Sequence, residues 1–378
     1  MLEAAAEQRR TLEALMKKGR YRELAPKVGL DFTSNDYLGL AASPRLRGAI
    51  SWAIDRGVPV GSGGSRLLRG NHPEHEALEQ EAARFFGADR ALYWSSGFAA
   101  NAALFSTLPR REDLVIYDEL VHASVHEGIA SIKAQSTSVP HNDAGAFSDA
   151  IRRWRLSGGK GRVWIAVESL YSMEGDQAPL TDLAEIANRE GAFLIIDEAH
   201  ATGIYGAGGR GFSASLEGRE NVIVLHTCGK ALGVSGAIVC ASRTICEYLV
   251  NRARSFIYST APSPLAAAAV REALKIVSDS PQRRTKLQDL ATFANSTAIK
   301  AGFAATSSQI IPIKIGASGH AMRVAEQIKA SGFDVRAIRP PTVPEGTARL
   351  RVAITLQVDR TAITTLFGLI REAMERQP

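Results

Sequence analysis

Two residues that follow apolar runs offer the clearest chemistry in this chain: Lys230, in the polar turn after residues 222–225, and Asp197, directly after residues 193–196. Apolar runs of this kind are typical of buried parallel strands, and in open α/β sheets ligands bind at the carboxyl ends of such strands. A lysine amine at that edge can form a Schiff base, and a carboxylate on a nearby strand can keep a pyridinium nitrogen protonated. The pair predicts a pyridoxal-phosphate site.

Residues 95–101 are a candidate phosphate-binding turn. They follow the apolar run 91–94 and precede alanine-rich helical sequence, so Ser96, Gly97 and Phe98 should lie at a helix N-terminus with N–H groups directed at an anion. Taken alone, a serine beside a glycine is more typical of an ordinary helix cap. Residues 61–66, rich in glycine and serine, are a second candidate for the same task.

The histidines are weaker signals. His122 follows an apolar run, so it should lie near the same sheet edge, where its ring could lie flat on a cofactor, although a lone histidine is more often structural. His122 and His126 are spaced for a shared metal on a helix, but no H-E-x-x-H motif or third ligand accompanies them, and no metal site is predicted. His141, between a proline and Asn142, has the sequence of a turn.

Two other motifs are excluded as nucleotide sites. Residues 197–200 match a helicase DEAH box, but such an ATPase also needs a P-loop, and neither Lys160 nor Lys230 is followed by serine or threonine. Residues 206–211 match G-x-G-x-x-G without directly following a strand, which favours a flexible loop.

Composition indicates a soluble, cytoplasmic globular protein. The 378 residues carry a net charge of +6, which invites a nucleic-acid interpretation, but the basic residues are scattered among 39 acidic ones. This mild positive field suits an anionic small molecule or an acidic carrier protein equally well, and no nucleic-acid partner is expected. Three dispersed cysteines form no disulfide framework or C-x-x-C zinc motif. The N-terminus lacks the pattern of a secretory signal, and no apolar stretch approaches the roughly 20 residues that span a bilayer.

The periodicity of the chain predicts the elements that position these residues. Residues 1–25 have a helical pattern, and residues 30–40 suggest a short strand and turn. Helical patterns then alternate with apolar runs as far as residue 275, which predicts a mostly parallel sheet with helices on both faces. The expected strands are residues 90–94, 113–117, 162–167, 193–196, 222–225 and 236–240.

The remaining pattern favours a smaller C-terminal domain. Pro262 and Pro264 interrupt the alternation, a long helix to about residue 300 is expected after them, and the rest alternates like an antiparallel sheet with helices on one side. We therefore predict an α/β protein with an N-terminal helix and arm (1–44), a large cofactor-binding domain (45–275) and a small α+β domain (276–378).

In combination and in this order, the motifs resemble the α-oxoamine synthases, fold-type I pyridoxal-phosphate enzymes. The resemblance covers nearly the whole chain and rests on residues 33–40, 61–66, 96–101, 122–124, 172–176, 197–200, 227–233 and 257–260. It implies that Lys230 carries the cofactor, Asp197 pairs with its ring nitrogen and His122 stacks on its ring. It also implies that Ser172 and His200 contact the polar substituents, and that Thr227 holds the phosphate together with Gly97 and Phe98.

The family resemblance also implies a reaction and a substrate site. Residues 337–351 resemble the biotin-pathway branch, which implies decarboxylative condensation of L-alanine with a pimeloyl thioester. Arg339 would bind a substrate carboxylate, Asn35 and Thr342 would assist, and Arg22 is the best match for a basic residue of the N-terminal arm, with Lys17, Lys18 and Arg20 as alternatives. Relatives are homodimers, in which Ser259 and Thr260 would reach the phosphate of the partner subunit.

Several alternatives stay open at this stage. Glycine, alanine and serine differ by one small side chain, a discrimination of about 1–3 kcal/mol that no motif settles, so 5-aminolevulinate synthase, 2-amino-3-ketobutyrate ligase and serine palmitoyltransferase remain runners-up. The acyl carrier could be coenzyme A or acyl carrier protein. A non-catalytic regulator on this fold would need a DNA-binding helix-turn-helix, for which the residues before Ser34 are too few. Departures from many relatives at Glu174, Glu198 and Ala201 do not touch the chemistry.

Overall fold

The computed structural model describes residues 5–24 and 26–376. It divides into two compact units: the larger comprises residues 35–172 and 176–287, and the smaller comprises the N-terminal residues through Ser34, residues 173–175 and residues from Gln288 onward. Residues 35–44 and 276–287 thus group with the larger unit. The three-domain division drawn from the sequence is not tested by this grouping and stays a prediction.

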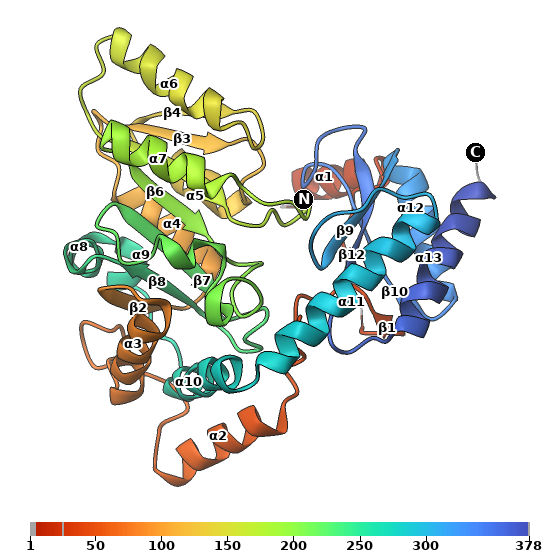
Figure 1. Cartoon of the computed structure of the whole chain (residues 1–378), viewed down its shortest axis with the longest axis horizontal. Coiled ribbons are helices and arrows are strands. Elements are labelled where there is room, and N and C mark those ends of the chain that lie inside the picture. Colours follow the sequence, from red (N-terminus) through yellow and green to blue (C-terminus); the bar gives the residue numbers. More distant parts are fainter. Residues whose placement is uncertain (1–4, 25, 377–378) are drawn as a thin grey trace. The chain divides into compact units, whose positions relative to one another are not determined.

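The larger unit is built on a seven-stranded sheet (Figure 1). Its strands lie in the order β2-β8-β7-β6-β5-β3-β4, and β8 alone runs in the opposite direction to the other six. Every residue of β5 and β7 is buried, which is why residues 163–167 and 222–225 form the continuous apolar runs of a sheet covered on both faces. The bounds are β2 (Arg90–Trp94), β3 (Leu114–Asp118), β4 (Gln135–Val139), β5 (Val163–Glu168), β6 (Phe193–Asp197), β7 (Val222–Thr227) and β8 (Ala237–Ala241).

Helices cover both faces of this sheet (Figure 1). One face shares a hydrophobic core with α4, α5, α8 and α9, whereas α3, α6 and α7 contact the sheet from outside that core. The helices of the larger unit are α2 (Pro44–Asp55), α3 (Pro73–Phe86), α4 (Gly97–Thr107), α5 (Ala123–Ala130), α6 (Ala144–Leu156), α7 (Leu180–Glu190), α8 (Arg243–Arg252), α9 (Arg254–Ile257) and α10 (Pro264–Asp279), with short 3₁₀ turns at Ala207–Gly209 and Phe212–Ser215.

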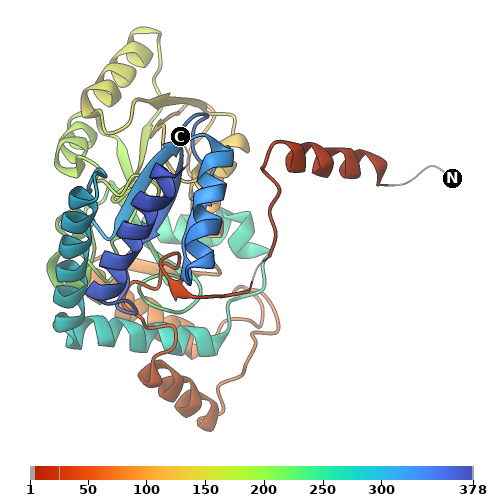
Figure 2. The same ribbon diagram turned by 90° about the vertical axis from the view of Figure 1, so that its right-hand side faces the viewer.

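The smaller unit contains an antiparallel sheet in the order β11-β12-β9 and a two-residue parallel pair, β1 with β10. Helix α12 packs on the sheet and α13 packs beside α12, as the blue ribbons in Figure 2 show. The elements are α1 (Ala6–Lys17), β1 (Leu30–Asp31), β9 (Ile310–Gly316), α12 (Ser318–Ala330), β10 (Phe333–Asp334), β11 (Arg336–Ile338), β12 (Ala348–Ala353) and α13 (Arg360–Glu375).

The predicted fold class is confirmed, and six strands of the large sheet lie within a residue or two of their expected positions. Three details were wrong. The N-terminal helix, expected to about residue 25, ends at Lys17. Strand β4 was missed because its polar sequence, at the sheet edge, has no apolar run. The single long helix expected after Pro264 is two helices, α10 and α11 (Pro281–Lys300), since Pro281 cannot continue α10.

Among the residues that the structure describes, no helix combines the length and apolar character needed to cross a membrane.

Candidate active site

Polar side chains gather where three neighbouring parallel strands of the larger unit end. Strand β6 ends at Asp197, β7 ends at Thr227, and β5 leads into the segment that carries Ser172. Lys230 lies in the loop that joins β7 to β8. Because the carboxyl ends of parallel strands share one edge, the sheet itself brings the predicted residues together.

Lys230 contacts a buried histidine. Its Nζ lies 2.6 Å from Nε2 of His200, and Nδ1 of the same ring lies 2.6 Å from the hydroxyl of Tyr37. His200 is 4 % exposed and Tyr37 is fully buried. The Tyr37 hydroxyl also donates to Oδ1 of Asn35 at 2.9 Å. A continuous line of hydrogen bonds therefore runs from Asn35 to the amine of Lys230.

Asp197 is held as a buried acceptor. Its Oδ2 accepts from Nδ2 of Asn101 at 2.7 Å, and its Oδ1 accepts from the backbone N–H of Ala199 at 2.9 Å. Asn101 lies inside α4 and also donates to the hydroxyl of Ser124 at 3.1 Å. This arrangement fixes the direction of the carboxylate at the sheet edge and leaves it suited to bind a cation.

His122 caps α5 and lies close enough to Asp197 and Lys230 to interact with both electrostatically. Its Nδ1 accepts from the backbone N–H of Ser124 at 3.2 Å and lies 2.8 Å from that residue's hydroxyl. Desolvation by the surrounding protein lowers the pKa of His122, and the positive charge of Lys230 lowers it further, although Asp197 acts in the opposite direction. The ring is thereby favoured in its neutral form, edge-to-face with Phe98.

The N-terminus of α4 faces the end of β7. Ser96 caps this helix by accepting from the N–H of Ala99 at 3.1 Å, and Gly97 and Phe98 follow in the first turn. A Cβ added at Gly97 would lie 3.6 Å from Oγ1 of Thr227. The first N–H groups of α4 and the Thr227 hydroxyl thus lie close together, the combination of donors that binds phosphate.

Ser172 is buried, and its N–H donates to Oε2 of Glu168 at 3.0 Å. It lies between Leu170 and Gln177, which form an isolated antiparallel bridge.

A charged histidine, His141, lies next to the segment enclosed by this bridge. The ring of His141 lies between two carboxylates, with Nδ1 3.0 Å from Asp118 and Nε2 2.9 Å from Asp176. Burial opposes a charge on His141, but these two hydrogen bonds outweigh it and raise the pKa of the ring to about 10. The expected turn is present, since Asn142 has a φ of 55°, but the side chain of His141 was undervalued as a mere turn residue.

Ser259 and Thr260 are exposed and line a small cleft together with Ser95 and Arg66 of the same chain. Their predicted reach into a partner subunit stays a prediction.

Three residues of the smaller unit that were predicted to bind substrate lie near one another. Nη2 of Arg22 lies 3.4 Å from the Thr342 hydroxyl, and the N–H of Thr342 donates to the carbonyl of Arg339 at 3.0 Å. Burial lowers the pKa of Arg339, and the charge of Arg22 lowers it further. Arg339 donates to the carbonyls of Gly19 and Tyr21. Two guanidinium groups that repel each other form a site that an anion would stabilise.

Arg20, one of the alternatives to Arg22 as the basic residue of the N-terminal arm, forms an ion pair with Glu345.

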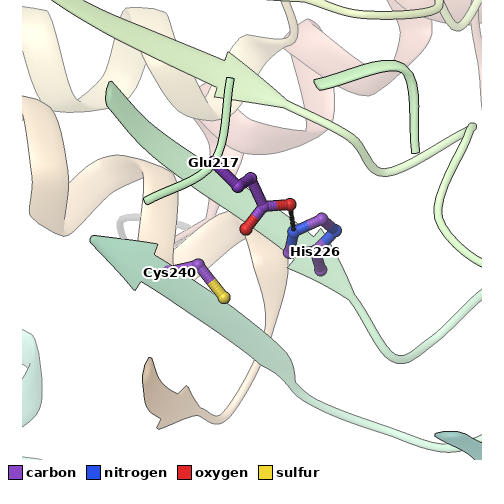
Figure 3. Close-up of side chains that lie close together, drawn as sticks. All are labelled: Glu217, His226 and Cys240. Carbon is purple, nitrogen blue, oxygen red and sulfur yellow. Dashed lines mark hydrogen bonds and ion pairs between the residues drawn. The ribbon is translucent and has the colours of Figure 1, made fainter. Parts of the chain in front are cut away.

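One cluster of possible metal donors occurs among the described residues, at Glu217, His226 and Cys240 (Figure 3). Nε2 of His226 lies 3.0 Å from Oε1 of Glu217, and its Nδ1 lies 2.8 Å from the Thr202 hydroxyl. Hydrogen bonds thus occupy both ring nitrogens, and the ring of Phe86 stacks on His226 with centroids 3.6 Å apart. Burial raises the pKa of the Cys240 thiol well above its usual range. We interpret the cluster as a buried hydrogen-bonded group that ties β7 to β8.

Two contact residues of the site were missed by reasoning from the sequence. Tyr37 belongs to a motif that carried the family resemblance, but no role was predicted for it. Asn101 was quoted as the last residue of the phosphate turn, yet an asparagine inside an apolar helix is itself a signal, because a buried amide needs hydrogen-bond partners. It finds them in Asp197 and Ser124.

Comparisons with known proteins identify the family of this chain. The family model for class I and II aminotransferases matches residues 27–366. A curated 8-amino-7-oxononanoate synthase from Anaeromyxobacter dehalogenans strain 2CP-1 is 40% identical over 97% of this chain and 95% of its own length. The curated enzyme of the same description from Geobacter sulfurreducens is 40% identical over 91% of each chain.

Solved structures show the same fold. An 8-amino-7-oxononanoate synthase from Francisella tularensis is 29% identical, with a TM-score of 0.78 over 92% of this chain and 98% of its own. A serine palmitoyltransferase from S. paucimobilis, solved with a PLP–myriocin adduct bound, has a TM-score of 0.90 over 100% of this chain and 98% of its own. At 24% identity, that second likeness supports the fold alone.

Proposed function

This chain belongs to the class I and II aminotransferase family and, within it, to the 8-amino-7-oxononanoate synthases, and from this membership we propose that it condenses L-alanine with a pimeloyl thioester and releases carbon dioxide. The product is 8-amino-7-oxononanoate, a step of biotin biosynthesis. The observation that carries the proposal is the 2.6 Å contact between Lys230 and His200, beside the buried, hydrogen-bonded carboxylate of Asp197.

The residues at the sheet edge fit pyridoxal phosphate. A lysine amine, a buried carboxylate and a helix N-terminus beside a threonine hydroxyl match the carbonyl, the ring nitrogen and the phosphate of that cofactor in turn. A Cβ at position 97 would meet Leu225 and Thr227 at ordinary van der Waals distance, so the first turn of α4 lies directly beside the Thr227 hydroxyl. When bound, the cofactor supplies an electron sink for the carbanion formed at the substrate carbon.

The protein contributes charge, position and a base. Asp197 favours a protonated ring nitrogen, because a carboxylate beside a nitrogen base stabilises its cationic form. Ser96, Gly97, Phe98 and Thr227 hold the phosphate, with Ser259 and Thr260 reaching that of a partner subunit. His122 packs on the ring, and Ser172 and His200 contact its polar substituents. The amine of Lys230, once free, takes the proton from the alanine carbon.

The arginine pair of the smaller unit is proposed to bind carboxylates. Arg339 binds the carboxylate of alanine, for which a planar, bidentate donor is suited. Arg22 binds the distal carboxylate of the pimeloyl chain, and Asn35 and Thr342 assist. Support comes from the environment of Arg339: burial lowers the pKa of its guanidinium, the charge of Arg22 lowers it further, and a bound anion would relieve this repulsion.

The assembly and location are also proposals. We infer a homodimer with cytoplasmic localisation, without nucleic-acid or membrane partners. All three cysteines are free and buried, which suits a reducing compartment.

The test is an assay of carbon dioxide release with alanine, glycine and serine against pimeloyl, acetyl, succinyl and palmitoyl thioesters, each on coenzyme A and on acyl carrier protein. Alanine with a pimeloyl thioester should give the highest kcat/KM. A higher value for glycine with acetyl or succinyl thioester, or for serine with palmitoyl thioester, would overturn the proposed substrates.

A second measurement isolates the cofactor assignment. Borohydride treatment of the purified enzyme should fix pyridoxal phosphate covalently on the peptide that contains Lys230, as seen by mass spectrometry. Lys230→Ala should show no such fixation and no turnover. Fixation on another lysine would contradict the assignment of Lys230.

A further inference from the structure

Four side chains of the larger unit form one hydrogen-bonded line: Asn35, Tyr37, His200 and Lys230. The three contacts measure 2.9, 2.6 and 2.6 Å in that order. The His200 ring lies between Tyr37 and Lys230 in this line. Along it, Tyr37 can therefore affect the lysine amine only through the imidazole. The line therefore raises the question of which nitrogen of His200 carries the proton.

The chemistry of the two ends answers it. The Tyr37 hydroxyl has one proton, which it donates to Oδ1 of Asn35, an atom that can only accept. Its oxygen is then left to accept from Nδ1–H of His200. In a neutral imidazole with a proton on Nδ1, Nε2 holds a lone pair. That lone pair faces Nζ of Lys230, which as an ammonium can only donate.

We propose that Tyr37 is a positioning residue that fixes His200 in the Nδ1–H tautomer, so that Nε2 is a proton acceptor for Lys230. A proton that Lys230 has taken from the substrate carbon can then pass from Nζ to Nε2. The products of this transfer are a neutral amine and an imidazolium, whose Nδ1–H remains bonded to the Tyr37 oxygen. Lys230 is thereby returned to its basic form. The inference rests on the proposed function for its catalytic meaning.

The structure holds Tyr37 rigidly enough for this task. Asp36 caps the turn that follows, its carboxylate accepting from the N–H groups of Leu40 at 2.8 Å and Ala41 at 3.2 Å. A Cβ at Gly233, in the loop of Lys230, would lie 2.5 Å from the nitrogen of Ala41. The lysine loop and the Tyr37 segment are therefore packed backbone against backbone, which only a glycine at position 233 permits, and its φ of +67° favours glycine as well.

The experiment is ¹⁵N NMR of the holoenzyme labelled at histidine, with the His200 signals assigned from their loss in His200→Gln. In the wild type, Nδ1 of neutral His200 should carry the proton and Nε2 should not. Tyr37→Phe keeps the ring and removes the acceptor, so the proton should shift toward Nε2. The kcat of Tyr37→Phe should fall about tenfold, as the loss of one hydrogen bond in the transition state predicts, with little change in the KM for alanine.

A second variant keeps the test decisive if Tyr37→Phe does not fold. In Asn35→Leu the Tyr37 hydroxyl loses its acceptor and can turn to donate to Nδ1 of His200, which should also move the proton to Nε2. Tyr93→Phe is the matched control, because Tyr93 is a fully buried tyrosine whose hydroxyl donates elsewhere, to the carbonyl of Ser235 at 2.9 Å. It should leave the His200 tautomer and kcat unchanged.

Three results would overturn the inference: a wild-type His200 with its proton on Nε2, a Tyr37→Phe or Asn35→Leu variant that keeps the Nδ1–H tautomer, or the same tautomer shift in Tyr93→Phe. The tautomer is read without turnover. A wild-type enzyme that fails to release carbon dioxide from alanine and pimeloyl thioester would therefore contradict the proposed function while the NMR result stands or falls by itself.

Discussion

Replacing His141 by glutamine should destabilise the larger unit by about 2–3 kcal/mol near pH 6. The change removes the imidazolium that lies between Asp118 and Asp176, so each carboxylate loses an ion pair. Because Asp118 ends β3 and Asp176 directly precedes Gln177, whose bridge to Leu170 encloses the segment of Ser172, the variant should also bind the cofactor less tightly.

The magnitude follows from how deeply each partner is buried. The side chain of Asp118 is 1% exposed, whereas that of Asp176 is 44% exposed. A hydrogen bond to a buried charge contributes about 1.5–3 kcal/mol, and a solvent-exposed ion pair about 0–1 kcal/mol. Asp118 keeps the N–H donors of Asn142 at 2.7 Å and Leu120 at 2.8 Å, so the loss should stay below the roughly 3–5 kcal/mol of a fully orphaned buried charge.

The effect should depend on pH with a defined sign. Folding raises the pKa of His141 from its usual 6.5 to about 10, so the folded state holds the proton more tightly than the unfolded chain. The stabilisation is fully present below about pH 6.5, declines as the pH rises and is lost above about pH 10. Urea unfolding of wild type and His141→Gln at pH 6, 8 and 10 measures this difference.

Asp176→Asn is the control within the same cluster, and it should cost under about 1 kcal/mol because its carboxylate is partly solvated. A difference between wild type and His141→Gln that stays constant or grows from pH 6 to 10 would refute the reasoning.

Three further predictions concern other parts of the chain. Asp197→Asn should still bind pyridoxal phosphate, seen by its absorbance, but lose about 100-fold or more in kcat because the charge beside the ring nitrogen is gone; near wild-type turnover would contradict the pairing. Arg339→Lys keeps the charge but not the planar fork, so the KM for alanine should rise by about 5- to 100-fold, and an unchanged KM would argue against a carboxylate at that residue. Burial raises the thiol pKa of Cys228, Cys240 and Cys246, so iodoacetamide at pH 8 should modify none of them in the native enzyme and all three in urea, as read by mass spectrometry.

Much of the large sheet could be predicted because its buried strands begin with continuous apolar runs. Residues 193–196 and 222–225 need no context to be recognised as strands, and the polar residues that follow them lie at the same sheet edge for that reason. Strand β4 carries glutamine, serine and threonine at the sheet edge, where one neighbouring strand suffices to hold it. Such a strand is defined by its partner β3 and not by its own pattern.

The contacts of the candidate site were harder to predict than the strands, because they join residues that are far apart in the sequence. Lys230 and Asp197 could be singled out by residue type and position alone. Tyr37 could not, because its significance comes from a hydroxyl 163 residues away in sequence from the imidazole that it contacts. His141 was misjudged for the same reason, since Asp118 and Asp176 lie 23 and 35 residues from it along the chain.

The antiparallel pairing of β7 with β8 has a consequence for how the chain around Lys230 opens. The ladder pairs Thr227 with Ala237, and the N–H of Cys228 extends it by donating to Gly236 at 2.9 Å. Inside the loop, the N–H of Gly233 donates to the carbonyl of Lys230 at 2.9 Å. Opening the hydrogen bond of Cys228 therefore requires the ends of β7 and β8 to separate. The amide of Cys228 should therefore exchange its hydrogen more slowly than amides of the loop that are not part of the ladder.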